Sequence, residues 1–163
     1  MNWTKEVEEK AANAGSFIEL GLIALNYLET LYASNGGKKF GIVSGPITSG
    51  GVGNIEGNRE IFRKTIENLE NLGILIFDQM PFQPHMDRIR KTLGDSYDQS
   101  GLLDSFYLPL FKSGYLGRMY MIHDFQSSFG SRWEHTIALD FSVERVLLPE
   151  DFHLMEIVKD KAA

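Results

Sequence analysis

Residues 38–46 read KKFGIVSGP, and this stretch predicts how the chain begins its sheet. The short apolar run Phe40 to Val43 ends in Ser44-Gly45-Pro46, which is the pattern of a buried strand that leads into a loop. The following residues, up to position 57, are rich in glycine. Glycine lets the backbone approach a ligand closely, but such a loop is equally well explained as a mobile connection.

The residues after this loop complete a larger unit. A helix is predicted from Asn58, as its N-cap, to about Leu72, and Gly73 follows its end. The apolar stretch ILIFD, residues 74–78, is predicted as a second strand. Strand, loop, helix and strand with short connections form a βαβ unit, which implies a parallel sheet and a right-handed crossover.

Further elements are predicted on the C-terminal side. We expect a helix over residues 102–114 despite Pro109, a strand over 118–125, a helix over about 132–143 and a strand over 145–149. The last residues are expected to form a C-terminal helix. Residues 79–99 hold two prolines and many polar residues, and a segment of this kind predicts a loop or lid over a site.

A long helix is predicted before the first strand, over residues 4–34, with a break near Gly15 or Gly21. Its apolar residues recur at three- and four-residue spacing, which favours packing in the core or, alternatively, in a subunit interface. The whole chain is predicted to be one α/β domain. Residues 1–38 would form a helical extension, residues 39–150 the core and residues 151–163 a C-terminal segment.

Composition excludes several classes of function. The formal net charge of −6 argues against a nucleic acid polymer as partner, since binding phosphates needs a surplus of Lys and Arg. The absence of cysteine excludes disulfides, thiolate metal sites and cysteine nucleophiles. No uncharged apolar run reaches membrane length, and the N-terminus is too charged for a secretory signal. We therefore expect a cytoplasmic protein with no membrane partner.

Candidate site residues follow the predicted strands, because ligands bind at the carboxyl ends of strands in an open parallel sheet. Three such ends are residues 44–48, Asp78 and residues 124–131. In the last of these, serine hydroxyls and a helix N-terminus suit an anion, although a serine there equally serves as a helix cap. Glu134 is expected in the first turn of that helix, either as a catalytic acid or as a surface acid that complements the helix dipole.

Other chemistries lack their motifs. The four histidines show no metal-ligand spacing, and no P-loop, dinucleotide fingerprint or G-x-S-x-G elbow is present, so we predict no metal and no cofactor. Two carboxylates, Asp104 and Glu134, become interesting if the fold brings them together. One carboxylate would then attack an anomeric carbon while the other manages a proton, as in glycosyl chemistry.

Several short motifs resemble the nucleoside 2-deoxyribosyltransferase superfamily. They are SGPIT at residues 44–48 after a strand, a helix that opens at Asn58, Gly73 before a second strand, and the spacing Ser128-x-Gly130-x-x-x-Glu134. The last spacing is most similar to the 2′-deoxynucleoside 5′-phosphate N-hydrolases, and the SGPIT loop to uncharacterised deoxyribosyltransferase-like proteins. The resemblance covers about residues 40–149, and the first 38 residues and the segment 79–99 lie outside it. It implies a flavodoxin-like or Rossmann-like three-layer sandwich with a central parallel sheet and an extra N-terminal helix.

The resemblance also implies roles for individual residues. Glu134 would be the nucleophile that attacks C1′ of the sugar and forms a covalent glycosyl-enzyme, and Asp104 would hydrogen-bond the substrate and assist proton transfer. Ser128 and Gly130 match positions that hold a 5′-phosphate, and the first loop faces the sugar. The implied substrate-binding residues are Gly45, Pro46, Ile47, Thr48, Asp78, Ser128, Gly130 and Ser131. The implied partner is a small nucleoside or nucleotide, and a homo-oligomer is expected.

Three departures from the family and two alternatives accompany this interpretation. Thr48 stands where the hydrolases carry a basic residue, and residues 114–118 are extra material between Asp104 and Glu134. Arg132 and Trp133 stand where the family has small or apolar residues. One alternative is a nucleotide-binding or sensing module on the same fold without turnover. The other is a phosphoribohydrolase, against which the absence of a PGGxGTxxE-like motif counts.

Overall fold

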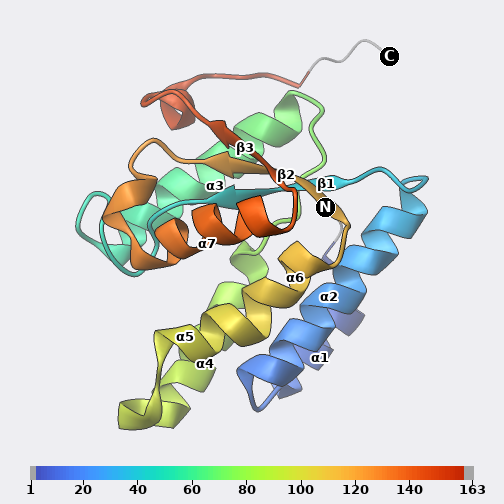
Figure 1. Cartoon of the computed structure of the whole chain (residues 1–163), viewed down its shortest axis with the longest axis vertical. Helices are drawn as coiled ribbons and strands as arrows, with labels where there is room; N and C mark the ends of the chain where they lie inside the picture. Colours follow the sequence, from blue (N-terminus) through green and yellow to red (C-terminus); the bar gives the residue numbers. More distant parts are fainter. Residues whose placement is uncertain (1–2, 160–163) are drawn as a thin grey trace. The chain divides into compact units, whose positions relative to one another are not determined.

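The structure is a computed structural model that describes residues 3–159 (Figure 1). The chain divides into two compact units, each made of two stretches of sequence. The helical unit holds the residues up to Lys39 together with Gln79–Tyr115. The sheet unit holds Phe40–Asp78 together with the residues from Leu116 onward. Over residues 3–159, every helix is too short or too polar to cross a bilayer.

The sheet unit contains a small open sheet of three parallel strands in the order β1-β2-β3. The strands are β1 (Phe40–Ser44), β2 (Leu116–Met121) and β3 (Glu144–Leu147). Every residue of β1 is buried, which matches its apolar sequence. The prediction of a mixed α/β fold with a parallel sheet is confirmed.

The second predicted strand, residues 74–78, is reduced to one bridge. Ile76 lies opposite Gly41 of β1, on the edge of β1 away from β2. The Gly41 N–H donates to the Leu75 carbonyl at 2.7 Å, and the Phe77 N–H donates to the Gly41 carbonyl at 2.8 Å. The stretch is short because Ile74 N–H is still bonded to the end of the preceding helix at Leu69. The chain therefore runs beside β1 for only about three residues.

Two helices cover opposite faces of this sheet. Helix α3 (Ile55–Asn71) follows β1, and α7 (Phe129–Asp140) joins β2 to β3. The two crossovers run in opposite directions from the middle of the sheet, so the right-handed rule places their helices on opposite faces. Figure 1 shows α7 in front of the sheet and α3 behind it.

Both helices begin earlier than predicted. The N-cap of α3 is Asn54, whose side chain accepts a hydrogen bond from the Gly57 N–H at 2.7 Å, so the assignment of Asn58 as N-cap is wrong. Helix α7 begins at Phe129 with Ser128 as its N-cap. Capping side chains at both positions explain the earlier starts, because each satisfies a backbone N–H of the first turn.

The helical unit contains α1 (Lys5–Asn13), α2 (Phe17–Ser34) and α4 (Gln83–Leu93), followed by α5 (Gln99–Leu102) and α6 (Leu108–Lys112). The predicted helix 4–34 is broken near Gly15, as expected. Ser16 caps α2 by accepting from the Glu19 N–H at 3.1 Å, and the Glu19 carboxylate accepts from the Gly15 N–H at 2.8 Å. This reciprocal arrangement is a variant of the capping box and fixes where α2 starts.

Residues 79–99, predicted as a loop or lid over a site, are instead mostly helix, so the expected loop is wrong, while a role as a lid stays a prediction. The two prolines of this segment lie in the first turns of helical segments. The N–H groups of a first turn have no acceptor within the helix, so proline there costs no helical hydrogen bond. Phe82, Met86 and Ile89 recur at helical spacing and are buried. Arg88 of α4 donates to the carbonyls of Ala11 and Ala14 at 3.1 and 2.8 Å, which closes the C-terminus of α1.

The helix through Pro109 is confirmed in a modified form. Residues Leu103–Tyr107 form a π-helical segment between α5 and α6. A proline ring clashes with the carbonyl four residues earlier in an α-helix, and here that carbonyl belongs to Ser105. The wider turn removes this conflict and lets the helix continue. A Cβ atom on Gly21 of α2 would lie 2.1 Å from the same carbonyl oxygen, so only glycine permits this close approach.

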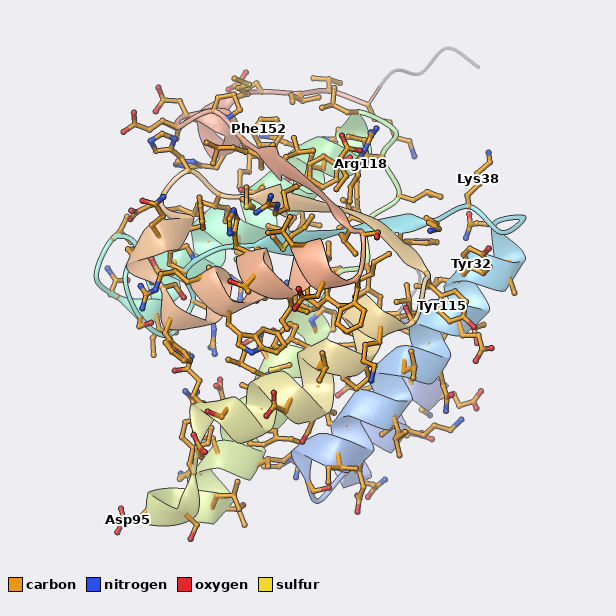
Figure 2. All side chains as sticks on the ribbon, in the orientation of Figure 1. Tyr32, Lys38, Asp95, Tyr115, Arg118 and Phe152 are labelled. Atoms are coloured by element: carbon orange, nitrogen blue, oxygen red, sulfur yellow. The ribbon has the colours of Figure 1, made fainter. Side chains whose placement is uncertain are left out.

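The expected C-terminal helix is absent from residues 148–159, and residues 160–163 lie outside the described part. A short 3₁₀ turn at Phe152–Leu154 precedes an extended tail (Figure 2). Asn68 of α3 donates to the carbonyls of Phe152 and Met155, both at 2.9 Å, and Asn71 donates to that of Ile157 at 2.7 Å. These side-chain amides bind carbonyls that a helix would have used, and they hold the tail along α3.

Candidate functional site

The carboxyl ends of β1 and β2 lie side by side in the sheet unit. Ser44, the last residue of β1, pairs with Met121, the last residue of β2. The chain leaves these two ends toward opposite faces of the sheet, through α3 and through α7. Such a switch point is where ligands bind in open α/β sheets. The sequence prediction that placed candidate residues after these two strands therefore directs attention to one edge.

The glycine-rich loop 45–54 is held by one buried side chain. Asn58 is 3% exposed, and its Nδ2 donates to the carbonyls of Ile47 and Gly50, each at 3.1 Å. Its Oδ1 accepts from the Val52 N–H at 3.0 Å. All three bonds close turns of the loop, so the alternative of a mobile connection is not favoured. Thr48 and Ser49, at the tip of the loop, are exposed.

A hydrogen-bond chain joins this loop to the loop after β2. The Gly51 N–H donates to Ser127 Oγ at 2.8 Å, and that hydroxyl donates to the Asp124 carbonyl at 2.8 Å. A Cβ on Gly50 would lie 2.4 Å from the Ser127 carbonyl oxygen, and one on Gly45 would lie 2.5 Å from the Ile122 side chain. The glycines are therefore needed for contact between the two loops.

Glu134 is buried on α7, with 7% of its surface exposed. It lies in the second turn, because α7 begins at Phe129, and it shares the inner face of the helix with Gly130, Ser131 and Ala138. The alternative of a surface acid that complements the helix dipole is therefore wrong. Whether the residue is catalytic stays a prediction.

The environment of Glu134 favours its neutral form. Burial raises the pKa of its carboxyl from 4.5 to about 8, and the Ser44 hydroxyl at the end of β1 partly counteracts this rise. Within residues 3–159, Oε2 has no hydrogen bond of normal geometry, and neither has Ser44 Oγ. An unsatisfied buried carboxyl beside a strand end is costly and is a mark of functional sites.

Of the serines before Glu134, Ser128 acts as a structural cap. Ser128 Oγ accepts from the Ser131 N–H at a long 3.5 Å, which is the N-cap bond of α7. Ser131 is 1% exposed and its hydroxyl has no partner within residues 3–159. Arg132 is exposed and donates to the Gln126 carbonyl at 2.7 Å, so its guanidinium turns back to the preceding segment. The predicted anion-binding role of Ser128, Gly130 and Ser131 stays a prediction.

The remaining predicted residues are spread over both units. Pro46 is buried and Asp78 half-buried, both in the sheet unit. Asp104 is exposed and lies in the π-helical segment of the helical unit. Since π-helical turns often occur at functional sites, its position suits a functional residue. Asp104 and Glu134 belong to different units, so their pairing stays a prediction.

A cavity of about 430 Å³ lies in the sheet unit at the ends of the strands. Its lining residues are Pro46, Gly51, Val52, Asn58, Ile61, Ile122, His123, Asp124, Glu150 and His153. Glu134 is not among them. Sequence reasoning missed the group of His123, Glu150 and His153. The available signal was that Glu150 directly follows the predicted strand 145–149, whereas the predicted strand 118–125 included His123. Within residues 3–159, no three acidic or imidazole side chains are arranged to hold a metal ion.

None of the protein-family models, curated proteins or solved structures with which the chain was compared matches it. The resemblance of the SGPIT and S-x-G-x-x-x-E motifs to the deoxyribosyltransferase superfamily therefore stays a prediction. Function is inferred from the chemistry at the ends of β1 and β2.

Proposed function

We propose that the protein cleaves, or transfers across, the N-glycosidic bond of a (deoxy)nucleoside or its 5′-monophosphate, with Glu134 as nucleophile. The observation that carries the proposal is the buried carboxyl of Glu134, next to Ser44 at the end of β1, with its pKa raised to about 8. A strongly perturbed acid at a strand end is a candidate catalytic group. The motifs of the first loop and of α7 support the same reaction.

A flavodoxin-like three-layer arrangement is the fold that we propose to accompany this activity. The order of the bridge at Ile76, β1, β2 and β3 supports it, as do α3 and α7 on opposite faces of the sheet. In folds of this order the ligand binds where the crossovers diverge. That place is occupied by the 45–54 loop, the Ser127 segment and the start of α7.

The reaction requires Glu134 to lose its proton. One carboxylate oxygen then attacks C1′, the bond from C1′ to the base nitrogen breaks, and the base leaves with the electron pair. Asp104 or solvent supplies a proton to the leaving base. A water molecule, or a nitrogen of a second base, next attacks C1′, and the bond from C1′ to the Glu134 oxygen breaks. Glu134 leaves as carboxylate, and the attacking water or base loses its proton to solvent.

The raised pKa of Glu134 predicts the pH dependence of this reaction. The free protein holds most of its Glu134 protonated at neutral pH, so kcat/KM for base release should rise with pH and level off above about 8. A general-acid role would give the opposite profile, with activity falling above about 8. A profile measured between about pH 5 and 10 therefore distinguishes nucleophile from acid.

The test is to incubate the protein with deoxynucleosides, ribonucleosides and their 5′-monophosphates and to measure free base by chromatography. We expect release from at least one substrate, a covalent glycosyl adduct by mass spectrometry, and loss of both in Glu134→Gln. Glu56→Gln, at an exposed glutamate of α3, is the matched control and should keep full activity. Full activity in Glu134→Gln would overturn the proposal.

A nucleotide-binding or sensing module is the second candidate. The same neutral Glu134 favours it, because a protonated carboxyl donates and accepts hydrogen bonds but does not attack C1′. This candidate predicts saturable binding of a nucleotide, weakened in Glu134→Ala, with no free base released across the substrate panel. The homo-oligomer, likewise a proposal, is checked by light scattering.

A further inference from the structure

We infer that the cavity between the 45–54 loop, the end of β2 and the turn after β3 is a binding site for a small organic amine, meaning an ammonium group on a compact apolar body. The site lies wholly within the sheet unit and does not include Glu134. It shares Pro46 and the 45–54 loop with the nucleoside site proposed above, but its ligand is bound by different charged groups, and its test does not need base release.

The size and the walls of the cavity suit a small organic molecule. A volume of about 430 Å³ lies in the range of pockets that hold such ligands. Pro46, Val52, Ile61 and Ile122 supply an apolar surface on which the body of the ligand can pack. This wall comes from three elements of the unit: the loop, α3 and the segment after β2.

The cavity is also preformed. Asn58, which lines the cavity, forms hydrogen bonds with the 45–54 loop through both the nitrogen and the oxygen of its side-chain amide. Gly51 is fixed to Ser127 by a hydrogen bond of 2.8 Å. A ligand that enters does not have to order this wall, so little of its binding free energy is lost to loop entropy.

The charges around the cavity select for a cation. Its ionisable lining groups are the carboxylates of Asp124 and Glu150 and the imidazoles of His123 and His153, and no lysine or arginine is among the described lining residues. Within residues 3–159, none of these four side chains makes a hydrogen bond or ion pair with another residue, so all remain available to a ligand. An ammonium group would be attracted by both carboxylates, whereas a phosphate would be repelled.

A metal ion is the weaker occupant of this site. The four ionisable groups are not arranged so that three of them hold one ion. An alkylammonium does not require such convergence, because its charge is satisfied by one or two carboxylates while its carbon atoms cover the apolar wall. An organic cation therefore fits both the polar and the apolar part of the lining.

Three probes of nearly equal size separate charge from shape: phenethylamine, phenethyl alcohol and 3-phenylpropionate. Binding to the full chain is followed by NMR chemical shifts and by calorimetry at neutral pH. We expect the amine to bind saturably at millimolar concentration, with shifts at Val52, Ile61 and Ile122. The alcohol should bind more weakly, and the carboxylate should show no binding.

The double variant Asp124→Asn/Glu150→Gln removes both carboxylates from exposed positions and should weaken amine binding about tenfold. The control Glu56→Gln/Glu60→Gln makes the same change in net charge on exposed residues of α3 outside the cavity, and should leave binding within about twofold. Equal binding of amine and alcohol, an undiminished affinity in the first variant, or no saturable amine binding would each overturn the inference. None of these results depends on base release.

Discussion

Glu134 shows how much a single carboxyl depends on the helix that carries it. The residues that face inward with it are small, and they recur three or four positions apart: Gly130, Ser131 and Ala138. This spacing was readable in the sequence and indicates a buried face. This buried face was missed because the helix was expected to start at about Arg132. That start placed Glu134 in the first turn, where acids normally complement the helix dipole.

The same carboxyl should make stability depend on pH. Its folded-state pKa of about 8 is above the ordinary value of 4.5, so the folded protein keeps a proton that the unfolded chain has lost. The resulting stabilisation is fully present below about pH 4.5 and is lost as pH rises through about 8. Each pKa unit corresponds to about 1.4 kcal/mol, so the full effect is on the order of 5 kcal/mol.

Glu134→Gln tests this linkage, because glutamine cannot titrate. We expect the free energy of unfolding of the wild type to fall relative to that of the variant by several kcal/mol between about pH 5 and pH 8. Urea unfolding of both proteins at the two pH values measures it, and Glu56→Gln should behave like wild type. Parallel pH dependences of wild type and Glu134→Gln would show that Glu134 ionises normally.

Asn58 should matter for stability through the loop that it holds. Asn58→Ala removes three hydrogen bonds and leaves Val52 N–H and two carbonyls without their partner, so we expect a loss of about 2 kcal/mol or more. Asn71→Ala, which removes one half-buried bond to Ile157, is the graded comparison and should cost about 1 kcal/mol or less. Denaturant unfolding measures both, and hydrogen exchange at Val52 should accelerate only in Asn58→Ala.

Among the helices, the contact of α2 with the π-helical segment Leu103–Tyr107 should be the least tolerant of added volume. Gly21→Ala places a Cβ 2.1 Å from the Ser105 carbonyl, and backbone atoms cannot rotate away, so we expect a loss of about 2 kcal/mol or more. Gly101→Ala, in α5, meets open space and should be neutral or slightly stabilising. Thermal unfolding compares the two, and equal effects would contradict the close approach.

The secondary structure was predictable where apolar residues recur at a regular spacing. The prediction failed where proline was read only as a sign of a loop. The strand predicted from Phe40 and the amphipathic helices are confirmed. The strands predicted over 118–125 and 145–149 are present with shifted bounds, at Leu116–Met121 and Glu144–Leu147. Residues 79–99 were predicted as a loop or lid from two prolines and many polar residues, although Pro81 and Pro84 lie in the first turns of helical segments. The predicted C-terminal helix failed because Asn68 and Asn71 bind the tail's carbonyls, a long-range effect that no local pattern reveals.

For the whole molecule, the division into two units follows from a chain that passes between them three times. Unit boundaries fall at residues 39–40, 78–79 and 115–116, and no composition change marks them. In the sheet unit, Phe40 pairs with Leu116. The residues next to them, Lys39 and Tyr115, are the C-terminal ends of the two stretches of the helical unit, so the pairing brings these two ends close together. The folding of the sheet therefore lowers the entropy cost of closing the helical unit.

Two tryptophans can report on this dependence, since Trp3 lies in the helical unit and Trp133 in the sheet unit. Gly41→Ala would place a Cβ 2.7 Å from the Tyr120 ring and should destabilise the sheet. Trp3→Phe leaves Trp133 as the only tryptophan, and Trp133→Phe leaves Trp3. We expect Gly41→Ala to lower the urea midpoint of tryptophan fluorescence in both of these proteins. A midpoint that falls only for Trp133 would show that the helical unit folds independently.

The π-helical segment Leu103–Tyr107 has a consequence for how the chain can change in length. A π-helical turn holds one residue more than an α-helical turn, so deletion of one residue there restores an ordinary helix. Each α-helical residue turns the helix by about 100°, so everything on one side of the deletion would rotate by that amount. Asp104 would then face a different direction relative to Gly21, and Pro109 would again clash with a backbone carbonyl. A lineage that loses this residue would be expected to lose Pro109 with it.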